Sequence, residues 1–538
     1  MQRTRSTARR LLLGGALLAG AVVLVPLVVM AVLALGGGTS TVGTLDFARE
    51  LRIPPLLEPR TDGAGRKVFD LRMQAGTSEL VEGRRTPTWG FNGPHLGPTL
   101  RAARGDRVAM RVTNGLSQTS TVHWHGMHLP ARADGGPHQT IAPGKTWMPS
   151  WTVDQPAATL WYHPHLHAGT EDHVYRGLAG MFILDDAEAE KLALPRRYGV
   201  DDIPLIVQDK RLDDDGALDF SKGMISPIGR LGDEILVNGT PNPHLDVRTA
   251  AVRLRLLNAS TARTYDFGFS DDRAFDLIAT DGGLLGAPAR IDRVQLSPGE
   301  RAEIVVRVRP GEDVVLRSHP PDLGDVGPLQ ARFVGARDSF DILELRAARR
   351  LAPSPRVPAT LVKQQMPPRE AQPRVRRFEL GDRDINDRKM DMSRIDAVVP
   401  VDTTEIWEIR NASGMPHNFH VHDTRFQVLE SDGVEPPPAL RGLKDTVLVR
   451  PGETVRLATR FNDYTDPATP YMFHCHLLQH EDRGMMGQFV VVAPGDGPAR
   501  GAVSPTPTDQ PAASTRARPA PSLAHRRGDH QGHPQESR

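Results

Sequence analysis

The chain repeats one pattern three times: a strand-like run that ends at an asparagine and is followed by a Pro-Gly turn. Polar and apolar residues alternate in runs such as 107–112, as they do in strands with one buried face. The three copies end at Asn114, Asn258 and Asn411, and their turns are Pro143-Gly144-Lys145, Pro298-Gly299-Glu300 and Pro451-Gly452-Glu453. A turn motif alone carries little weight. The joint repetition predicts three copies of one all-β domain.

The three copies differ in the side chains at two fixed offsets. At nine and eleven residues past the asparagine, the copies have, in chain order, His123 and His125, Phe267 and Phe269, and His420 and His422. Metal-ligating residue types therefore occupy the outer two copies, and apolar residues fill the same places in the middle copy. We expect metal ligands in the first and third domains only.

Stretches rich in Pro and Arg, at 194–202 and 346–374, separate the copies and indicate linkers between domains. We therefore predict three β-domains, at 45–185, 195–345 and 375–493, with a linker at 346–374 between the last two. Residues 1–40 are predicted as a signal or anchor, and residues 494–538 as a disordered tail.

Histidine and cysteine usage narrows the chemistry. The chain has 20 His and one Cys among 538 residues, which excludes a disulfide framework and a Cys-rich zinc or iron–sulfur site. Chance predicts roughly 0.7 His-x-His pairs at this histidine frequency, and the chain has five. The formal net charge of +1 argues against a nucleic-acid partner.

A His-x-His pair on a strand directs both imidazoles to one face, because side chains alternate along the strand. In His474-Cys475-His476 the cysteine then faces the other way, so one segment can contribute to two metal centres. His417, Cys475, His480 and Met485 form the His₂Cys set with a weak axial Met that suits a blue-copper site.

Four segments together resemble the copper signatures of three-domain multicopper oxidases, which include bacterial laccases, bilirubin oxidases and copper-efflux oxidases. The segments are His123-Trp124-His125-Gly126, Trp161-Tyr162-His163-Pro164-His165, His417-Asn418-Phe419-His420-Val421-His422 and His474-Cys475-His476-Leu477-Leu478-Gln479-His480. The resemblance spans residues 45 to 493. It implies three cupredoxin-like Greek-key β-sandwiches and four copper ions per chain, one type 1, one type 2 and two type 3.

Carried over by position, the resemblance assigns every predicted ligand to a copper. Type 1 copper falls to His417, Cys475, His480 and Met485; type 2 copper to His123 and His420; and the type 3 pair to His125, His163, His165, His422, His474 and His476. Domains one and three would share the trinuclear cluster at their interface, with the middle domain as a spacer. Domain one has Pro164 and Leu178 where domain three has Cys475 and Met485, so we expect no type 1 copper there.

Four residues are predicted to act in catalysis. A reductant would be oxidised near His480, and the electron would pass through Cys475 to its two histidine neighbours. Glu481 and Asp134 match positions where the family keeps acids for proton delivery.

The N-terminus predicts export. Arg9-Arg10-Leu11-Leu12-Leu13 partly matches a twin-arginine signal, and residues 11–35 are uncharged and apolar. This pattern fits either a cleaved signal or a retained membrane anchor. Both place the rest of the chain outside the cytoplasm, in the periplasm, in the cell envelope or secreted.

The sequence therefore predicts a laccase-like multicopper oxidase that uses O₂ and a small reducing substrate, a phenol or a metal ion, and acts as a monomer. A cuprous-ion oxidase is the alternative, because the ligands alone do not separate the two. A non-catalytic cupredoxin envelope or division protein would show eroded ligands. A copper nitrite reductase usually carries type 1 copper in its first domain, where this chain has Pro164.

Overall fold

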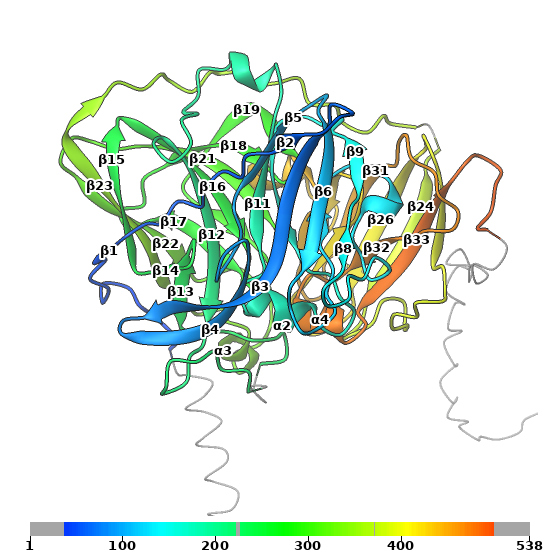
Figure 1. Cartoon of the computed structure of the whole chain (residues 1–538), viewed down its shortest axis with the longest axis horizontal. Coiled ribbons are helices and arrows are strands. Elements are labelled where there is room, and N and C mark those ends of the chain that lie inside the picture. Colours follow the sequence, from blue (N-terminus) through cyan, green and yellow to red (C-terminus); the bar gives the residue numbers. More distant parts are fainter. Residues whose placement is uncertain (1–36, 222–225, 371, 500–538) are drawn as a thin grey trace, which may run out of the picture.

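The computed structural model describes residues 37–221, 226–370 and 372–499. Strands dominate, and they form three β-sandwiches, called domains 1, 2 and 3 in chain order (Figure 1). This arrangement confirms the predicted all-β class with three cupredoxin-like domains. The predicted signal or anchor at 11–35 and most of the predicted tail lie outside the described residues.

Domain 1 consists of a four-stranded and a six-stranded sheet packed around one apolar core. Its elements are β2 (Arg60–Thr61), β3 (Lys67–Val81), β4 (Arg84–Phe91), β5 (Leu100–Ala103), β6 (Arg107–Asn114), β7 (His123–His125), β8 (Thr146–Trp147), β9 (Ser150–Thr152), β10 (Ala158–His163), α2 (Thr170–Tyr175) and β11 (Gly180–Asp185), with 3₁₀ turns at Ala131–Ala133 and Ala189–Lys191.

Domain 2 pairs a seven-stranded with a six-stranded sheet. Its elements are β12 (Asp202–Lys210), β13 (Glu234–Val237), β14 (Thr240–Pro241), β15 (Pro243–Thr249), β16 (Ala251–Asn258), β17 (Tyr265–Phe269), β18 (Phe275–Thr280), β19 (Gly283–Ile291), β20 (Val294–Leu296), β21 (Arg301–Arg307), β22 (Asp313–His319), α3 (Gln330–Phe333) and β23 (Phe340–Ala352).

Domain 3 pairs two five-stranded sheets. Its elements are β24 (Arg374–Leu380), β25 (Ala397–Pro400), β26 (Thr404–Asn411), β27 (His417–Val421), β28 (Phe426–Ser431), β29 (Leu443–Lys444), β30 (Thr446–Val449), β31 (Thr454–Arg460), β32 (Tyr471–His474), α4 (Leu478–Asp482) and β33 (Met486–Val492), with a 3₁₀ turn at Pro438–Leu440.

The repeat in the sequence corresponds to a repeat in topology. The sheets that carry the histidine offsets have the neighbour orders β5-β11-β10-β7, β15-β23-β22-β17 and β25-β33-β32-β27. In the second sheets, β3 pairs with β6, β12 with β16, and β24 with β26, in each case in parallel. The same pairing scheme thus recurs in all three domains.

The marker asparagines explain why the sequence repeat exists. The Asn411 side chain donates to the carbonyl oxygens of Met415 and Val449 and accepts the Ser413 N–H, which ties the end of a strand to the next loop and to a neighbouring strand. Asn114 and Asn258 make the equivalent bonds in their domains. In each domain the asparagine carbonyl accepts the N–H of the Pro-Gly turn glycine. The asparagine and the turn are therefore parts of one local structure.

Three strands lie across the predicted domain limits. β1 (Arg49–Glu50), at the start of the segment predicted as domain 1, pairs in parallel with β15 of domain 2. β23 continues to Ala352, past the predicted start of the linker at residue 346. The linker residues 353–370 and 372–373 have neither helix nor strand, and the linker bonds to domain 2 through the Leu361 N–H and the Gly286 oxygen. β24 then begins at Arg374, one residue before the predicted start of domain 3.

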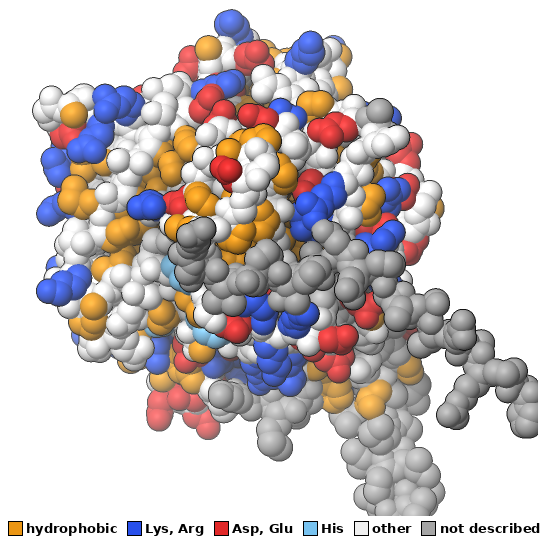
Figure 2. All heavy atoms as spheres, turned by 90° about the vertical axis from the view of Figure 1, so that its right-hand side faces the viewer, with side chains coloured by type: hydrophobic (Ala, Val, Ile, Leu, Met, Phe, Trp, Pro, Cys, Tyr) orange, Lys and Arg blue, Asp and Glu red, His pale blue; other side chains and the backbone are white. Residues whose placement is uncertain are grey.

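The surface carries both signs of charge. Figure 2, which faces the right-hand side of Figure 1, shows Lys and Arg side chains as well as Asp and Glu side chains spread over this face. Helices are short: α2, the longest described α-helix, has six residues. Within the described ranges, no helix is long and apolar enough to cross a membrane.

Candidate metal centres

Strand register places the histidine pairs in the same way in both outer domains. β7 and β10 of domain 1 are antiparallel, with His123 opposite His163. β27 and β32 of domain 3 are antiparallel, with His420 opposite His474. In the middle domain Phe267 lies opposite Ser318 and is buried in an apolar core. The repeat therefore brings facing histidines together only in domains 1 and 3.

One cluster lies within domain 3 and contains the only cysteine. Cys475 Sγ is 3.6 Å from His417 Nδ1 and 3.7 Å from His480 Nδ1, and the two nitrogens are 3.2 Å apart. Met485 is fully buried in the same core, and its backbone oxygen accepts the Cys475 N–H. The helix α4 carries His480, which explains how residues five apart in sequence face the same point. The four residues predicted for type 1 copper are thus neighbours.

The other eight predicted ligands form clusters at the interface of domains 1 and 3. In each cluster, one nitrogen from every ring lies within 4.8 Å of the others: His123, His420 and His422; His125, His163 and His476; and His165, His422 and His474. Within the third cluster, His165 Nε2 is 3.1 Å from His474 Nε2 and 3.2 Å from His422 Nε2. All eight rings are buried. Each cluster combines rings from both domains.

The donor atoms suit a copper ion. His123 Nε2, His420 Nε2 and both ring nitrogens of His476 are buried and have no hydrogen-bond partner among the described residues. Burial, together with repulsion between neighbouring imidazoles, holds the pKa of most of these rings well below the ordinary value; they are His125, His163, His165, His420, His422 and His474. Neutral imidazole is the form that binds metal. A thiol, a thioether and imidazoles together fit copper.

The Cys475 thiol depends on a cation for its ligand form. Burial raises its pKa to about 12, so the side chain is a neutral thiol at physiological pH. A coordinated metal ion deprotonates a thiol outright. The Asn418 side-chain oxygen lies 3.6 Å from Sγ, where it accepts the thiol proton.

The two predicted proton-delivery acids lie against the ligand rings. Asp134 Oδ2 is 2.8 Å from His422 Nδ1, and its backbone oxygen is 3.0 Å from His123 Nδ1. Glu481 lies between two rings, 3.4 Å from His165 Nδ1 and 3.3 Å from His474 Nδ1. Burial raises the pKa of Glu481 well above its ordinary value, which favours the protonated form of this carboxyl group.

Sequence reasoning missed two polar residues beside the clusters. Asp445 Oδ1 is 3.0 Å from His125 Nε2, and the Asp445 backbone oxygen is 2.8 Å from His420 Nδ1. Asn418 accepts the His476 N–H at 2.6 Å. Strand parity could have indicated Asn418, since it shares a face with His420. No spacing in the sequence indicates Asp445, because it lies between β29 and β30, beyond two strands that follow β27.

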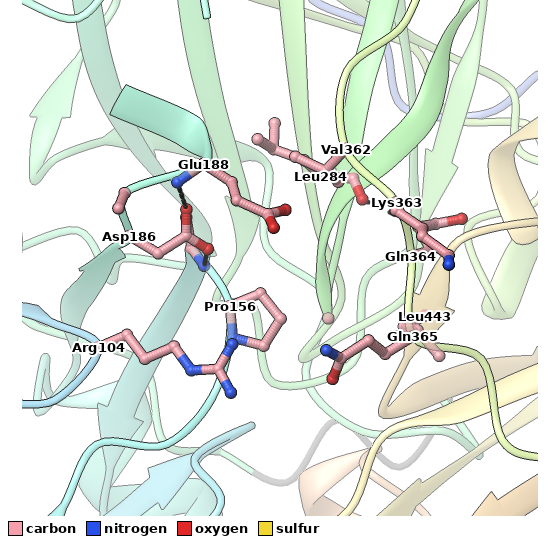
Figure 3. Close-up of a pocket in the computed structure, with 13 residues that line it drawn as sticks. Arg104, Pro156, Asp186, Glu188, Leu284, Val362, Lys363, Gln364, Gln365 and Leu443 are labelled. Carbon is pink, nitrogen blue, oxygen red and sulfur yellow. Dashed lines mark hydrogen bonds between the residues drawn. The ribbon is translucent and has the colours of Figure 1, made fainter. Parts of the chain in front are cut away.

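A surface cavity lies apart from the histidine clusters. One cavity of about 210 Å³ opens where the three domains and the linker meet, and its lining includes Arg104, Asp186, Leu284, Gln364 and Leu443 (Figure 3). It contains none of the predicted ligands. The histidine clusters themselves are internal, because all of their rings are buried.

Comparison with known proteins agrees with this geometry. Residues 72–189 and 351–495 match family models described as multicopper oxidase. Multicopper oxidase mco of Staphylococcus aureus is 36% identical over 451 residues, 82% of this chain and 92% of that protein. Cell division protein FtsP of Dickeya dadantii is 38% identical over 453 residues, with the same coverage of 82% and 92%.

The solved structures include a similar laccase. The crystal structure of laccase from Pediococcus acidilactici superposes with a TM-score of 0.75 at 33% identity, covering 82% of this chain and 93% of that chain. These matches confirm the resemblance that the histidine motifs carry. The chain belongs to the multicopper oxidase family.

Proposed function

We propose that this protein is a laccase-like oxidase that couples one-electron oxidation of a phenol or a metal ion to the reduction of O₂ to water. The observation that carries the proposal is the completeness of the donor set: all twelve predicted ligands are present, buried and grouped. Copper, when bound, would supply the electron transfer and the oxygen chemistry, with one type 1, one type 2 and two type 3 ions.

The segment around Cys475 would connect the two sites. Its thiol faces His417 and His480, whereas the neighbouring His474 and His476 rings belong to the interface clusters. The connection is covalent and short, and every residue in it is buried. His480 Nε2 donates to the Pro227 oxygen at 3.0 Å, which holds the ring in place. We expect the reducing substrate to approach on the His480 side.

Glu481 and Asp134 would handle protons beside the interface clusters. Burial favours the protonated form of Glu481, which lies beside two rings and could therefore deliver a proton where oxygen is reduced. Asp134 accepts a hydrogen bond from His422 Nδ1, which fixes the ring so that Nε2 faces the cluster.

A second candidate is a non-catalytic role, which the similarity to cell division protein FtsP suggests. Such a protein has no need to keep twelve metal ligands buried together. The intact clusters favour the oxidase. If the protein is an oxidase, its copper ligands are the same for a phenol oxidase and for a cuprous-ion oxidase.

Copper titration of the purified full chain tests these alternatives. We expect four coppers per chain, an intense visible band from type 1 copper and a type 2 paramagnetic resonance signal. Oxygen uptake with a phenol, compared with uptake on cuprous ion, then identifies the substrate class. A chain that binds no copper and consumes no oxygen with either would support the non-catalytic role.

We also propose that the chain is exported, on the basis of Arg9, Arg10 and the apolar run at 11–35. Replacement of both arginines by lysine should leave the protein in the cytoplasmic fraction, whereas the parent should appear in the cell envelope or outside the cell. Equal distribution of the two proteins would argue against the twin-arginine route.

A further inference from the structure

The Pro-Gly turn of the middle domain differs from its two counterparts. In domains 1 and 3 the turn glycines, Gly144 and Gly452, face open space, and a Cβ atom on either would meet nothing within 4 Å. In domain 2, residues 297–300 are all buried. A Cβ atom on Gly299 would lie 3.1 Å from the His476 ring and 3.2 Å from the His125 ring. The turn of the domain without predicted ligands therefore packs on two ligand rings.

One arm of this turn reaches the interface clusters through Arg301. This side chain is completely buried, and both terminal nitrogens donate to the Asp445 carboxylate at 2.7 Å. Asp445 in turn contacts His125 through its carboxylate and His420 through its backbone oxygen. Arg301 Nε also donates to the Thr159 oxygen of domain 1 at 2.9 Å. One guanidinium thus joins all three domains beside the rings.

A second arm reaches the cysteine cluster through Asn418. The Asn418 amide donates to Ser297 Oγ at 3.1 Å and to the Pro298 oxygen at 2.9 Å. Its side-chain oxygen accepts the His476 N–H and lies 3.6 Å from Cys475 Sγ. The same five-residue turn therefore orients groups at both predicted copper sites.

Charge pairing fixes the base of the turn. Lys444 Nζ lies 2.9 Å from both Asp281 and Glu300, and the Arg301 N–H donates to Asp281 at 2.7 Å. All of these groups are buried. A buried charge is stable only when it is paired and hydrogen-bonded, so the turn holds one position relative to domain 3.

We propose that residues 297–301 of the middle domain are a positioning element for the copper sites, and that Arg301 is its principal positioning residue. The proposal rests on the oxidase function proposed above. Arg301 fixes the Asp445 carboxylate, and Asp445 fixes the ring orientation of His125 and His420. A carboxylate on the outer nitrogen of a ligand histidine orients the ring and raises its basicity, and loss of such a partner typically lowers metal affinity about 10–100-fold.

The test is Arg301→Lys in the full chain, which keeps the charge but cannot make the two-pronged contact. The matched control is Arg376→Lys. Arg376 is equally buried and binds the Glu405 carboxylate with two nitrogens, at 3.0 and 2.9 Å, but Glu405 contacts no predicted ligand. Copper per chain, the type 2 paramagnetic resonance signal, the type 1 visible band and the unfolding midpoint are measured for the parent and for both variants.

We expect Arg301→Lys to bind type 2 copper about 10–100-fold more weakly and to change its resonance signal, with the type 1 band retained. The control should lose thermal stability but keep the copper content and both signals of the parent. Parental copper binding and spectra in Arg301→Lys would overturn the proposal while leaving the oxidase function intact. A parent chain that shows no type 1 or type 2 signal would overturn both.

If Arg301→Lys does not accumulate as folded protein, the same copper and spectroscopic measurements are made on Asp445→Asn. Asparagine keeps the size of the side chain and removes the charge that Arg301 holds. The same loss of type 2 copper is expected, and unchanged copper affinity and spectra would again contradict the proposal.

Discussion

Domains 1 and 3 share one backbone framework but differ in the side chains that it places next to the strands with the histidine pairs. In domain 3 the Met485 N–H donates to the His480 oxygen, and in domain 1 the Leu178 N–H donates to the His173 oxygen in the same way. His173 therefore occupies the place of His480. Ser120, three residues before His123 as His417 is before His420, is 3.0 Å from His173 Nδ1. The backbone frame of the predicted type 1 site is therefore present in domain 1 without a thiol or a thioether.

The comparison shows that both domains provide the same backbone positions, and it indicates that a few side chains would decide whether such a site binds copper. Pro164 replaces Cys475, Leu178 replaces Met485, and Ser120 replaces His417. Domain 1 then retains only one imidazole at this place, and a single neutral imidazole is a weak copper site. Burial lowers the pKa of His173 to about 4, so the ring is neutral and packs as an ordinary core residue.

The largest expected effect comes from Cys475→Ser, which makes domain 3 resemble domain 1. Serine supplies no thiolate, so the visible band and steady-state oxidation should both fall to background. Absorption spectra and oxygen uptake measure the change. Ser120→Ala, at the matching place in domain 1, should leave both unchanged. A Cys475→Ser protein that remained blue would refute the type 1 assignment.

Glu481→Gln comes next, because domain 1 has the apolar Val174 where domain 3 has this acid. The amide cannot take up and give up a proton as a carboxyl group does, so reoxidation of the reduced enzyme by oxygen should slow by about a hundredfold. Anaerobic reduction of type 1 copper should proceed at the parental rate. Stopped-flow absorption follows both steps.

Glu171→Gln is the matched control for Glu481→Gln. Glu171 is also a buried acid, but it pairs with Arg230 at 2.9 Å, so we expect normal reoxidation in this variant. Slowed reduction of type 1 copper in Glu481→Gln, with normal reoxidation, would contradict a role in proton delivery.

A gain-of-function variant tests the same comparison by building a type 1 site in domain 1. The triple variant Ser120→His, Pro164→Cys and Leu178→Met would rebuild in domain 1 the donor set of domain 3, with His173 as the second imidazole. We expect one additional blue copper per chain and up to about a doubling of the visible band. Copper analysis and resonance spectra measure it. Unchanged copper content would show that the frame differs more than its hydrogen bonds indicate.

The smallest expected effect is on folding stability, and it concerns the basic side chain that follows each of two His-x-His pairs. His128 follows His125 by three residues, as Arg425 follows His422. Burial by itself would lower the pKa of His128, but Asp423 and Asp463, at 2.9 and 3.1 Å, outweigh it and raise the pKa to about 9. Burial lowers the pKa of Arg425 to about 10. His128 of domain 1 therefore pairs with two carboxylates of domain 3, and its pKa of about 9 lies in a pH range where stability can be measured.

The sign of this effect follows from the raised pKa. Protonated His128 stabilises the folded chain fully below its ordinary pKa of about 6.5, and the contribution disappears as the pH rises through about 9. We expect His128→Gln to lower stability by about 2 kcal/mol at pH 6, or a few degrees in the unfolding midpoint, and by much less at pH 10. Equal differences at the two pH values would contradict the charged pairing.

The ligand pattern was predictable because it is local. His-x-His pairs, strand parity and fixed offsets from Asn114 and Asn411 require only that the strands form and repeat. The contacts of Asp445 and Arg301 were not predictable, since they join strands of different domains, and sequence spacing carries no information about that distance. The pairing of β1 with β15 was not predicted for the same reason, because these strands are far apart in the sequence.

The sharing of rings between domains also has a consequence for biosynthesis. His165 and His422 are 257 residues apart in the chain, yet their Nε2 atoms are 3.2 Å apart. No interface cluster can exist until the domain 3 rings that contribute to it have been made and domain 3 has docked on domain 1. Metal loading at these clusters would therefore be a late event that requires domains 1 and 3 to be assembled, and bound metal would then indicate finished folding.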